Sequence, residues 1–351
     1  MHIPDNYLSP STCATLFVAM TPIWYYSIRK INKTLSADKI PLIGIGGAFA
    51  FILMMFNLPI PDGTTAHAVG GTLIALLLGP YAACIAISVA LFIQAIIFGD
   101  GGILSFGANC FNIAFILPFT GFFIYKILNK IHLSPFYHKC TIFLSAYISI
   151  NLAAFFTALE LGIQPLLFVD NLAQPLYCPY PLWISIPAMA LSHLTIAGIA
   201  EGLFTLSLYL FILKTSPNII YDSQQIKLNS IFSLLAFLII ISPIGLIAEG
   251  TAWGEWAPEE ILNDTSSGVP LGFIPEKLLN GFNYEAFFPD YTMSGTTDIL
   301  AYIASAIIGV ALLIIIFKIL ESIIYGLDRI LFLYGPSWML CLFGYQLCSV
   351  S

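Results

Sequence analysis

The chain has 351 residues, of which 59% are hydrophobic and 9% are charged, and its mean hydropathy is +0.92. Soluble domains carry about 25% charged residues, so this composition excludes a soluble globular protein and indicates a polytopic protein embedded in a lipid bilayer. The formal net charge is −7. We expect no nucleic-acid partner, because nucleic-acid binding needs a basic surface.

Apolar stretches separated by Gly, Pro and charged residues divide the chain into predicted membrane spans, each of which needs about 20 residues. In chain order these are 10–28, 41–59, 67–80, 81–98, 103–126, 140–162, 182–213, 228–247 and 298–318. The fold class is therefore all-α, a polytopic transmembrane bundle with about seven helices in a core and two in a C-terminal extension. The short 67–80 span requires that protein or a cavity satisfy its backbone.

The basic residues predict the orientation, because cytoplasmic loops carry an excess of Lys and Arg. All of them except Lys277 fit cytoplasmic positions when the N-terminus lies outside and the C-terminus inside. Lys277 lies within 248–297, where Glu and Asp residues concentrate. This acidic segment is predicted to be external.

The chain begins MHIPDNYLSP, a polar stretch before the first apolar run. It lacks the basic start and the early apolar region of a signal peptide. Ser9-Pro10 instead indicates a helix N-cap followed by proline at the first helical position. Residues 1–8 are therefore predicted to form a non-helical arm on the outer face.

Met1 and His2 carry three nitrogen donors on one short piece of chain: the α-amine, the His2 amide nitrogen and the His2 Nδ1. One metal ion could bind all three through a five-membered and a six-membered chelate ring. These donors lie in a plane, which favours Ni(II) or Cu(II), and cobalt less strongly. The fourth corner of the plane needs another donor, and a neutral imidazole is the expected one.

The position of each histidine predicts which one supplies the fourth donor. His132 and His138 lie in the basic, cytoplasmic loop 127–139, and His193 lies inside the 182–213 span. His67 ends the outer segment NLPIPDGTTAH and is on the same side as the arm. His67 is therefore the predicted ligand, with His193 the next candidate.

Other polar residues could shape the same pocket or simply join helices. Asn109 and Asn112, after the turn FGDGG, suit either hydrogen bonds between helices or a shell around the metal. Ionisable residues inside a span, such as His193 and Glu201, indicate function, although a buried hydrogen-bonded pair is an equal alternative. Glu160 lies near a span end and is expected to point toward the surface. The candidate pocket residues are Asp62, Asp100, Asn109, Asn112, His193 and Glu201.

The motifs that are absent restrict the reaction class. The sequence has no GxxxxGK[ST] phosphate loop, so ATP hydrolysis would have to come from partner subunits. It also has no HExxH and no GxSxG motif. Two alternatives to a metal-capture subunit stay open: a metal-dependent integral membrane enzyme that uses His193 and Glu201, and a metal sensor.

Several segments together resemble the CbiM/NikM family, the substrate-binding membrane components of energy-coupling-factor (ECF) transporters for cobalt and nickel. They are MHIPDNYLSP, GTTAHAVGGTL, FGDGGILSFGANCFN, SHLTIAGIAEG and GTAWGEW. The resemblance implies a CbiM/NikM-like core at 1–220 and a two-helix CbiN/NikN-like extension at 221–335 that contains the acidic loop. The tail 336–351 has no predicted role.

The resemblance also implies a metal held by Met1, His2 and His67, with Ni(II) or Co(II) as the transported substrate and no catalytic cofactor. The implied partners are a membrane scaffold (T) component and cytoplasmic ATPase (A) components in the cell membrane. The family usually begins MHIPDG, so Asn6 departs from the pattern; asparagine tolerates the left-handed conformation, and the turn is expected to survive. The Pro-Asp start is closer to the nickel-type members and favours nickel over cobalt.

Overall fold

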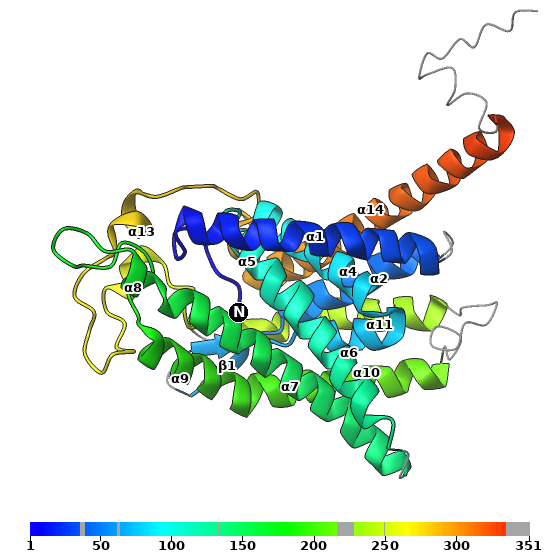
Figure 1. Cartoon of the computed structure of the whole chain (residues 1–351), viewed down its shortest axis with the longest axis horizontal. Helices are drawn as coiled ribbons and strands as arrows, with labels where there is room; N and C mark the ends of the chain where they lie inside the picture. The colour runs from blue at the N-terminus through cyan, green and yellow to red at the C-terminus, as the bar shows by residue number, and fades with distance from the viewer. Residues whose placement is uncertain (36–38, 62–63, 132–133, 216–227, 249, 335–351) are drawn as a thin grey trace, which may run out of the picture.

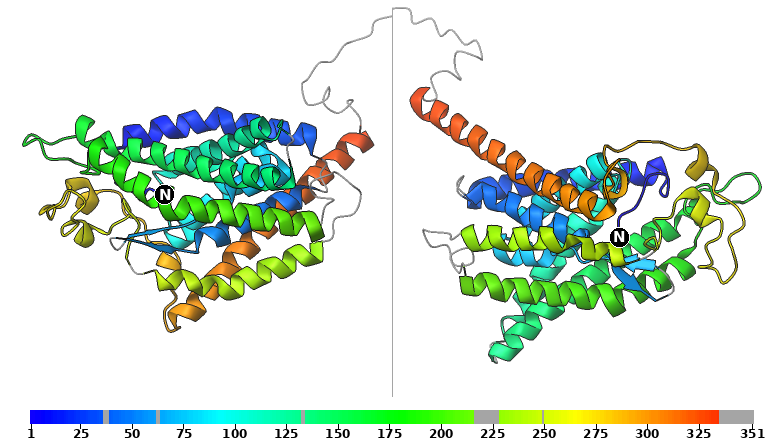
Figure 2. Two further views of the ribbon diagram at one scale, coloured as in Figure 1. Left: turned by 90° about the horizontal axis from the view of Figure 1, so that it is seen from below. Right: turned by 180° about the vertical axis from the view of Figure 1, so that it is seen from behind.

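Long apolar helices run side by side through most of the chain, and the loops gather at the ends of the bundle (Figure 1, Figure 2). The computed structural model describes residues 1–35, 39–61, 64–131, 134–215, 228–248 and 250–334, without the side chains of 228 and 324–334. The predicted all-α polytopic fold is confirmed. Within the described ranges, six helical stretches are long and apolar enough to cross a membrane: Pro80–Phe98, Phe106–Leu128, Pro135–Leu167, Leu182–Thr215, Asn229–Ile247 and Asp298–Ile323.

The first two thirds of the chain form helices with one short hairpin between the second and the third. Three π-helical turns, η2, η3 and η4, interrupt or end these helices, and such turns are often found at functional sites. The elements are α1 (Pro10–Thr34), α2 (Ile40–Met54), β1 (Leu58–Ile60), β2 (Thr64–Ala66), α3 (Gly71–Leu78), α4 (Pro80–Ile93), η2 (Gln94–Phe98), α5 (Phe106–Asn109), η3 (Cys110–Ile116), α6 (Leu117–Leu128), α7 (Pro135–Gly162), α8 (Gln164–Leu167), α9 (Leu182–Ser192), η4 (His193–Ala197) and α10 (Gly198–Thr215).

The remaining part of the described chain has two long helices joined by an irregular segment with short helical turns. Its elements are α11 (Leu228–Ile241), η6 (Ser242–Ile247), α12 (Pro258–Ile261), α13 (Glu276–Asn280), η7 (Pro289–Tyr291) and α14 (Asp298–Tyr334). The two predicted spans at 228–247 and 298–318 correspond to α11 with η6 and to α14. The tail 336–351 lies outside the described residues.

The start of α1 follows the prediction from Ser9-Pro10. Ser9 has extended backbone dihedrals, and its Oγ accepts a hydrogen bond from the Thr12 N–H at 3.2 Å. Pro10 occupies the first helical position, where a missing N–H costs nothing. The eight residues before Ser9 therefore stay outside the helix and are free to fold against other elements.

The helix predicted at 67–80 is wrong at its start. Residues 67–70 are not helical, Gly70 has a left-handed φ of 73°, and α3 begins only at Gly71. The span predicted at 41–59 also ends early, at Met54, because Pro59 and Pro61 cannot continue a helix. Between these helices β1 and β2 pair antiparallel, and the hairpin ends one residue before His67.

The last helix of the extension packs closely along α2. A Cβ atom added to Gly44 would lie 2.9 Å from Phe317 Cβ, and one added to Gly47 would lie 3.0 Å from Leu313 Cδ2. Small residues let helix backbones approach closely within a membrane. The extension is thus part of the helical bundle.

The irregular segments that matter for function lie at one end of the bundle. Figure 1 shows the arm, the β1–β2 hairpin and the 250–297 segment together there. The hairpin contacts the extension directly, because Thr64 Oγ1 donates to the Thr251 carbonyl at 3.1 Å. Their grouping on one face is what the predicted topology requires, and the placement of that face outside the cell stays a prediction.

Candidate metal centre

Ile3 anchors the arm to the segment that follows η2. Its N–H donates to Asn109 Oδ1 at 2.7 Å, and its carbonyl accepts from Asn109 Nδ2 at 3.0 Å and from the Gly102 N–H at 2.9 Å. A side-chain amide can satisfy both main-chain groups of one residue because it is both donor and acceptor. Asn109, a predicted pocket residue, therefore binds the arm directly after His2.

Asp5 anchors the next part of the arm. Its carboxylate accepts the N–H groups of Ile103 and Leu104 at 3.0 and 2.7 Å. Burial raises the pKa of Asp5, and these backbone hydrogen bonds act in the opposite direction. Gly102 permits the contact, since a Cβ there would lie 2.5 Å from the Asp5 nitrogen. The turn that contains Asp100 is thus shaped to receive the arm.

Asn6 joins the arm to the extension. Its φ is 68°, the left-handed conformation that the sequence led us to expect. Its side-chain amide donates to the Phe282 carbonyl at 2.8 Å and accepts the Phe282 N–H at 2.9 Å. The substitution of asparagine for glycine therefore keeps the turn and adds two contacts with the acidic segment.

The terminal amine of Met1 is buried and points to an acidic residue of the extension. Met1 is 3% exposed, and its nitrogen lies 3.1 Å from Glu255 Oε1. Tyr7, at the other end of the arm, donates from its hydroxyl to the Trp256 carbonyl at 2.7 Å. Two adjacent residues of the extension therefore hold the first and the seventh residues of the arm.

His2 is 3% exposed, and its Nδ1 lies 2.9 Å from Asp100 Oδ1. The other oxygen of Asp100 accepts from Gln94 Nε2 at 3.0 Å and from the Tyr291 hydroxyl. Burial by itself would raise the pKa of Asp100, but the charge and hydrogen bond of His2, together with the Tyr291 hydroxyl, hold it well below its usual range. Asp100 is therefore a carboxylate that orients the His2 ring.

His67 meets His2 at the end of the arm. The two rings are stacked, with centroids 4.9 Å apart and planes inclined by 26°. His67 is 4% exposed, and its Nδ1 lies 3.2 Å from the Ala68 carbonyl oxygen. Because a carbonyl can only accept, Nδ1 carries the proton and Nε2 keeps its lone pair. Burial, with the charges of the Met1 amine and His2, lowers the pKa of His67 well below its ordinary value, so the ring is neutral.

The ring nitrogens without a partner are Nε2 atoms. The Nε2 of His2, His67 and His193 are buried and have no hydrogen-bond partner among the described residues. A histidine whose Nδ1 is anchored and whose Nε2 is free has the arrangement of a metal ligand. For His2 this differs from the predicted chelate, which uses Nδ1: that ring must exchange Asp100 for the metal before the chelate can close.

Side chains alone do not complete a metal site here. Within the part of the chain that the structure describes, no group of three His, Cys, Asp or Glu side chains is arranged to hold a metal ion. A site at His2 and His67 therefore needs main-chain donors. The buried amine of Met1 and the amide nitrogen of His2 are main-chain donors that belong to the same two residues.

Glu201 and His193 do not form the pair that the sequence left open. Both oxygens of Glu201 accept the Gly70 N–H, and Oε2 also accepts the Val69 N–H at 2.7 Å. His193, in η4, instead directs Nδ1 to the Met189 carbonyl at 2.8 Å. Glu201 thus acts on the segment that follows His67.

Asn112 joins two helices. Its Nδ2 donates to Glu160 Oε2 at 2.7 Å, which links η3 to α7 and supports the structural interpretation of this asparagine. The expectation that Glu160 points to the surface is wrong, because Glu160 is 7% exposed and its side chain faces Asn112. Asp62 lies outside the described residues.

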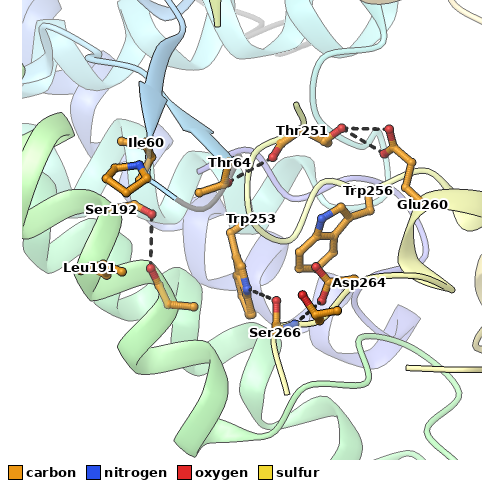
Figure 3. Close-up of a pocket in the computed structure, with 13 residues that line it drawn as sticks. Ile60, Thr64, Leu191, Ser192, Thr251, Trp253, Trp256, Glu260, Asp264 and Ser266 are labelled. Carbon is orange, nitrogen blue, oxygen red and sulfur yellow. Dashed lines mark hydrogen bonds between the residues drawn. The ribbon is translucent and has the colours of Figure 1, made fainter. Parts of the chain in front are cut away.

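A cavity of about 640 Å³ is lined by segments that adjoin the site in the chain (Figure 3). Its walls come from the β1–β2 hairpin, from the end of α9 and from the extension, and they include Ile60, Thr64, Ser192, Trp253, Trp256 and Asp264. Ser192 precedes His193 and Trp256 follows Glu255, so the same segments form the cavity and the centre. Among the described residues, the lining contains the carboxylates Glu260 and Asp264 and no basic side chain.

Three residues of this centre were missed by the sequence analysis: Gln94, Glu255 and Tyr291. Glu255 and Tyr291 lie in the acidic segment. The charge of that segment suggests only a general attraction for cations. Neither belongs to a motif with metal-ligand spacing. Gln94 itself was the one available signal, because it is a polar residue within an apolar run and amides at membrane depth form hydrogen bonds between helices.

Comparison with known proteins adds independent information. Residues 2–219 match the family model CbiM, described as "Cobalt uptake substrate-specific transmembrane region", and residues 228–325 match the PDGLE domain. The chain is 44% identical over 324 residues to the probable fused nickel transport protein LarMN of Lactiplantibacillus plantarum, covering 92% of this chain and 98% of the relative. It is 42% identical over 330 residues to the fused nickel transport protein NikMN of Rhodobacter capsulatus, covering 90% and 95%.

A solved structure is similar to part of the chain. It is the crystal structure of a truncated transition metal transporter, which is 50% identical, has a TM-score of 0.58, and is covered to 99% by 61% of this chain. A second crystal structure of a transition metal transporter matches with the same identity and TM-score and is covered to 93%. Both structures are covered almost completely by about three fifths of this chain.

Proposed function

The chain belongs to the CbiM family of cobalt uptake substrate-specific transmembrane proteins, and on this premise we propose that it is the nickel-capturing substrate component of an ECF-type ABC transporter. Its relatives are metal transport proteins, so the chain is a multi-pass membrane protein of metal uptake and not an enzyme. ECF-type assembly, nickel as the preferred ion, and the ligands below are the proposed parts.

The observation that carries the proposal is the meeting of His2 and His67 at a buried amino terminus. The two rings stack at 4.9 Å, and the Met1 amine is held inside the same part of the fold by Glu255. We assign the Met1 amine, the His2 amide and imidazole, and the His67 imidazole as the metal ligands. Four nitrogen donors in a plane favour Ni(II) over Co(II).

In this proposal, metal capture replaces the contacts that hold the ligand atoms in the metal-free protein. The Met1 ammonium group leaves Glu255 and the His2 Nδ1 leaves Asp100. Each of these two nitrogens and the His2 amide nitrogen releases one proton to solvent, and the three nitrogens then close the two chelate rings on the ion. The His67 imidazole, already neutral, fills the fourth position. Because the anchors at Ile3 and Asp5 involve other atoms, the rest of the arm keeps its place while the ligands exchange partners.

The energy for transport comes from partners in this proposal. A membrane scaffold component and cytoplasmic ATPase components would supply it, since the chain contains no phosphate-binding loop. Their docking face would be the end of the bundle opposite the arm, where basic residues concentrate. The protein would then reside in the cell membrane with the arm outside.

Titration of the purified full chain with Ni(II), Co(II) and Cu(II), followed by calorimetry and absorption spectroscopy, tests the assignment. We expect one Ni(II) per chain with the absorption of a planar nitrogen site, and weaker binding of Co(II). Binding of Ni(II) with the spectrum of an octahedral oxygen site would contradict the ligand set. Tighter binding of Co(II) than of Ni(II) would contradict the preference for nickel.

A further inference from the structure

Glu201 reaches the segment between His67 and α3 from a helix far along the chain. It is fully buried, and its carboxylate accepts the Val69 N–H at 2.7 Å and the Gly70 N–H at 2.9 Å. These are the second and third residues after His67. No Lys or Arg side chain is among its hydrogen-bond or ion-pair partners in the described part of the chain, so its contacts with the backbone account for its position.

The segment 67–70 needs such a partner. It follows a three-residue strand and precedes an eight-residue helix, so few hydrogen bonds of its own hold it. Gly70 has a left-handed φ of 73°, and the residue before α3 offers no side-chain cap. Backbone N–H groups at membrane depth must be satisfied within the protein. Glu201 satisfies two of them.

The contact with Val69 also acts on the His67 ring. The N–H of Val69 and the carbonyl of Ala68 belong to one planar peptide group. Glu201 accepts the N–H on one side of this group, and His67 Nδ1 donates to the carbonyl on the other side at 3.2 Å. The Glu201 carboxylate, the peptide group and the His67 imidazole thus form one chain of hydrogen bonds, and the unpartnered Nε2 lies at its end.

We propose that Glu201 is the positioning residue of His67, and that it acts through the Ala68–Val69 peptide group. The proposal rests on the proposed function, in which His67 Nε2 is the fourth nitrogen ligand. A carboxylate that directly accepts the second N–H of a ligating histidine fixes the ring and raises its basicity. Here one peptide group stands between them, and hydrogen bonds in a chain polarise one another.

Glu160 is a matched control because it is a second buried glutamate within a predicted span. Its carboxylate accepts from the Asn112 side chain, and none of its described hydrogen bonds involves residues 67–70 or the arm. Glu160→Gln and Glu201→Gln each replace one buried carboxyl group with an amide. Only the second change places an amide NH₂ group against the Val69 and Gly70 N–H groups.

The experiment compares Ni(II) affinity and the nickel absorption spectrum of the full chain carrying Glu201→Gln, Glu160→Gln, His67→Ala or both Glu201→Gln and His67→Ala. We expect Glu201→Gln to weaken binding about 10- to 100-fold and to shift the nickel absorption band, while Glu160→Gln changes neither. In a chain that already carries His67→Ala, Glu201→Gln should cause no further loss of Ni(II) affinity, because Glu201 acts only through the His67 ring.

Equal losses from Glu201→Gln and Glu160→Gln would overturn the proposal, as would a full additional loss in the double variant. An unchanged affinity for His67→Ala would instead contradict the proposed function. Glu201→Asp, which keeps the carboxyl group but shortens the side chain, covers the case in which Glu201→Gln does not fold. A shifted nickel band with an unshifted melting temperature in that variant supports positioning, and an unshifted band contradicts it.

Discussion

The terminal nitrogen of Met1 lies 3.1 Å from Oε1 of Glu255, although 254 residues separate the two in the chain. This ion pair connects the first residue of the chain to the part that matches the PDGLE domain. It also means that a ligand atom of the proposed site is held by a carboxylate before any metal arrives. The extension therefore helps to hold the arm in place, and it also packs against the other helices.

Loss of this ion pair should loosen the arm. We expect Glu255→Gln to increase amide hydrogen exchange in residues 1–8 of the metal-free protein, because a buried ammonium group without its partner is unfavourable. Glu259→Gln is the control, since Glu259 is exposed nearby and has no described contact with the arm. Equal exchange in both variants would show that Glu255 does not order the arm.

Removal of the His67 imidazole should strip the fourth ligand and leave the fold intact. We expect His67→Ala to lower Ni(II) affinity at least 10- to 100-fold, since even changes behind a ligand have effects of this size. His138→Ala removes an imidazole that contacts Asn129 in another part of the chain and should bind nickel normally. Unaltered binding by His67→Ala would move the ligand elsewhere, with His193 as the next candidate.

The exact start of the chain should matter, because the buried amine is a proposed ligand. An alanine inserted between Met1 and His2, or a few extra residues before Met1, would destroy the two chelate rings or bury a longer chain where Met1 is 3% exposed. We expect Ni(II) binding to be lost while the helices of the metal-free protein stay folded. Calorimetry on untagged and extended chains checks this, and equal affinity would exclude the amine as a ligand.

Asn6 offers a test of the turn that joins the arm to the extension. Asn6→Gly keeps the left-handed conformation but loses both hydrogen bonds to Phe282, which should cost about 1 kcal/mol of unfolding free energy. Asn6→Ala loses the same bonds and adds roughly 1 kcal/mol of left-handed backbone strain. Thermal unfolding of the two variants in detergent should therefore rank glycine above alanine. The reverse order would contradict the role of φ at this position.

The pH dependence of stability should carry a contribution from His67. Burial lowers its pKa below the ordinary value, so the folded ring stays neutral at a pH where the unfolded chain already binds a proton. The unfolding free energy therefore falls as the pH falls below about 6.5. We expect the metal-free melting temperature to drop less between pH 7 and pH 5.5 in His67→Ala than in the unaltered chain. Parallel curves would show that His67 is not neutral when folded.

Local sequence was sufficient for the parts of this protein that depend on local chemistry. Charge-poor apolar runs predicted a polytopic helical bundle, and Ser9-Pro10 predicted where α1 begins, because capping and proline geometry involve neighbouring residues. The donor set of Met1 and His2 could be proposed for the same reason, since a chelate ring joins atoms only a few bonds apart. Asn6 was expected to adopt the left-handed turn on its backbone preference alone.

The tertiary structure decided which distant groups meet these donors. Glu255 reaches the amine, Tyr291 reaches Asp100, and Glu201 reaches the segment after His67, across 254, 191 and 132 residues. It also decided that 67–70 is not helical, because a partner on another helix satisfies N–H groups that a helix would otherwise satisfy. Contacts between distant elements leave no pattern in the sequence around a single residue. No local rule therefore distinguishes Glu201, which holds the segment after His67, from Glu160, which joins two helices.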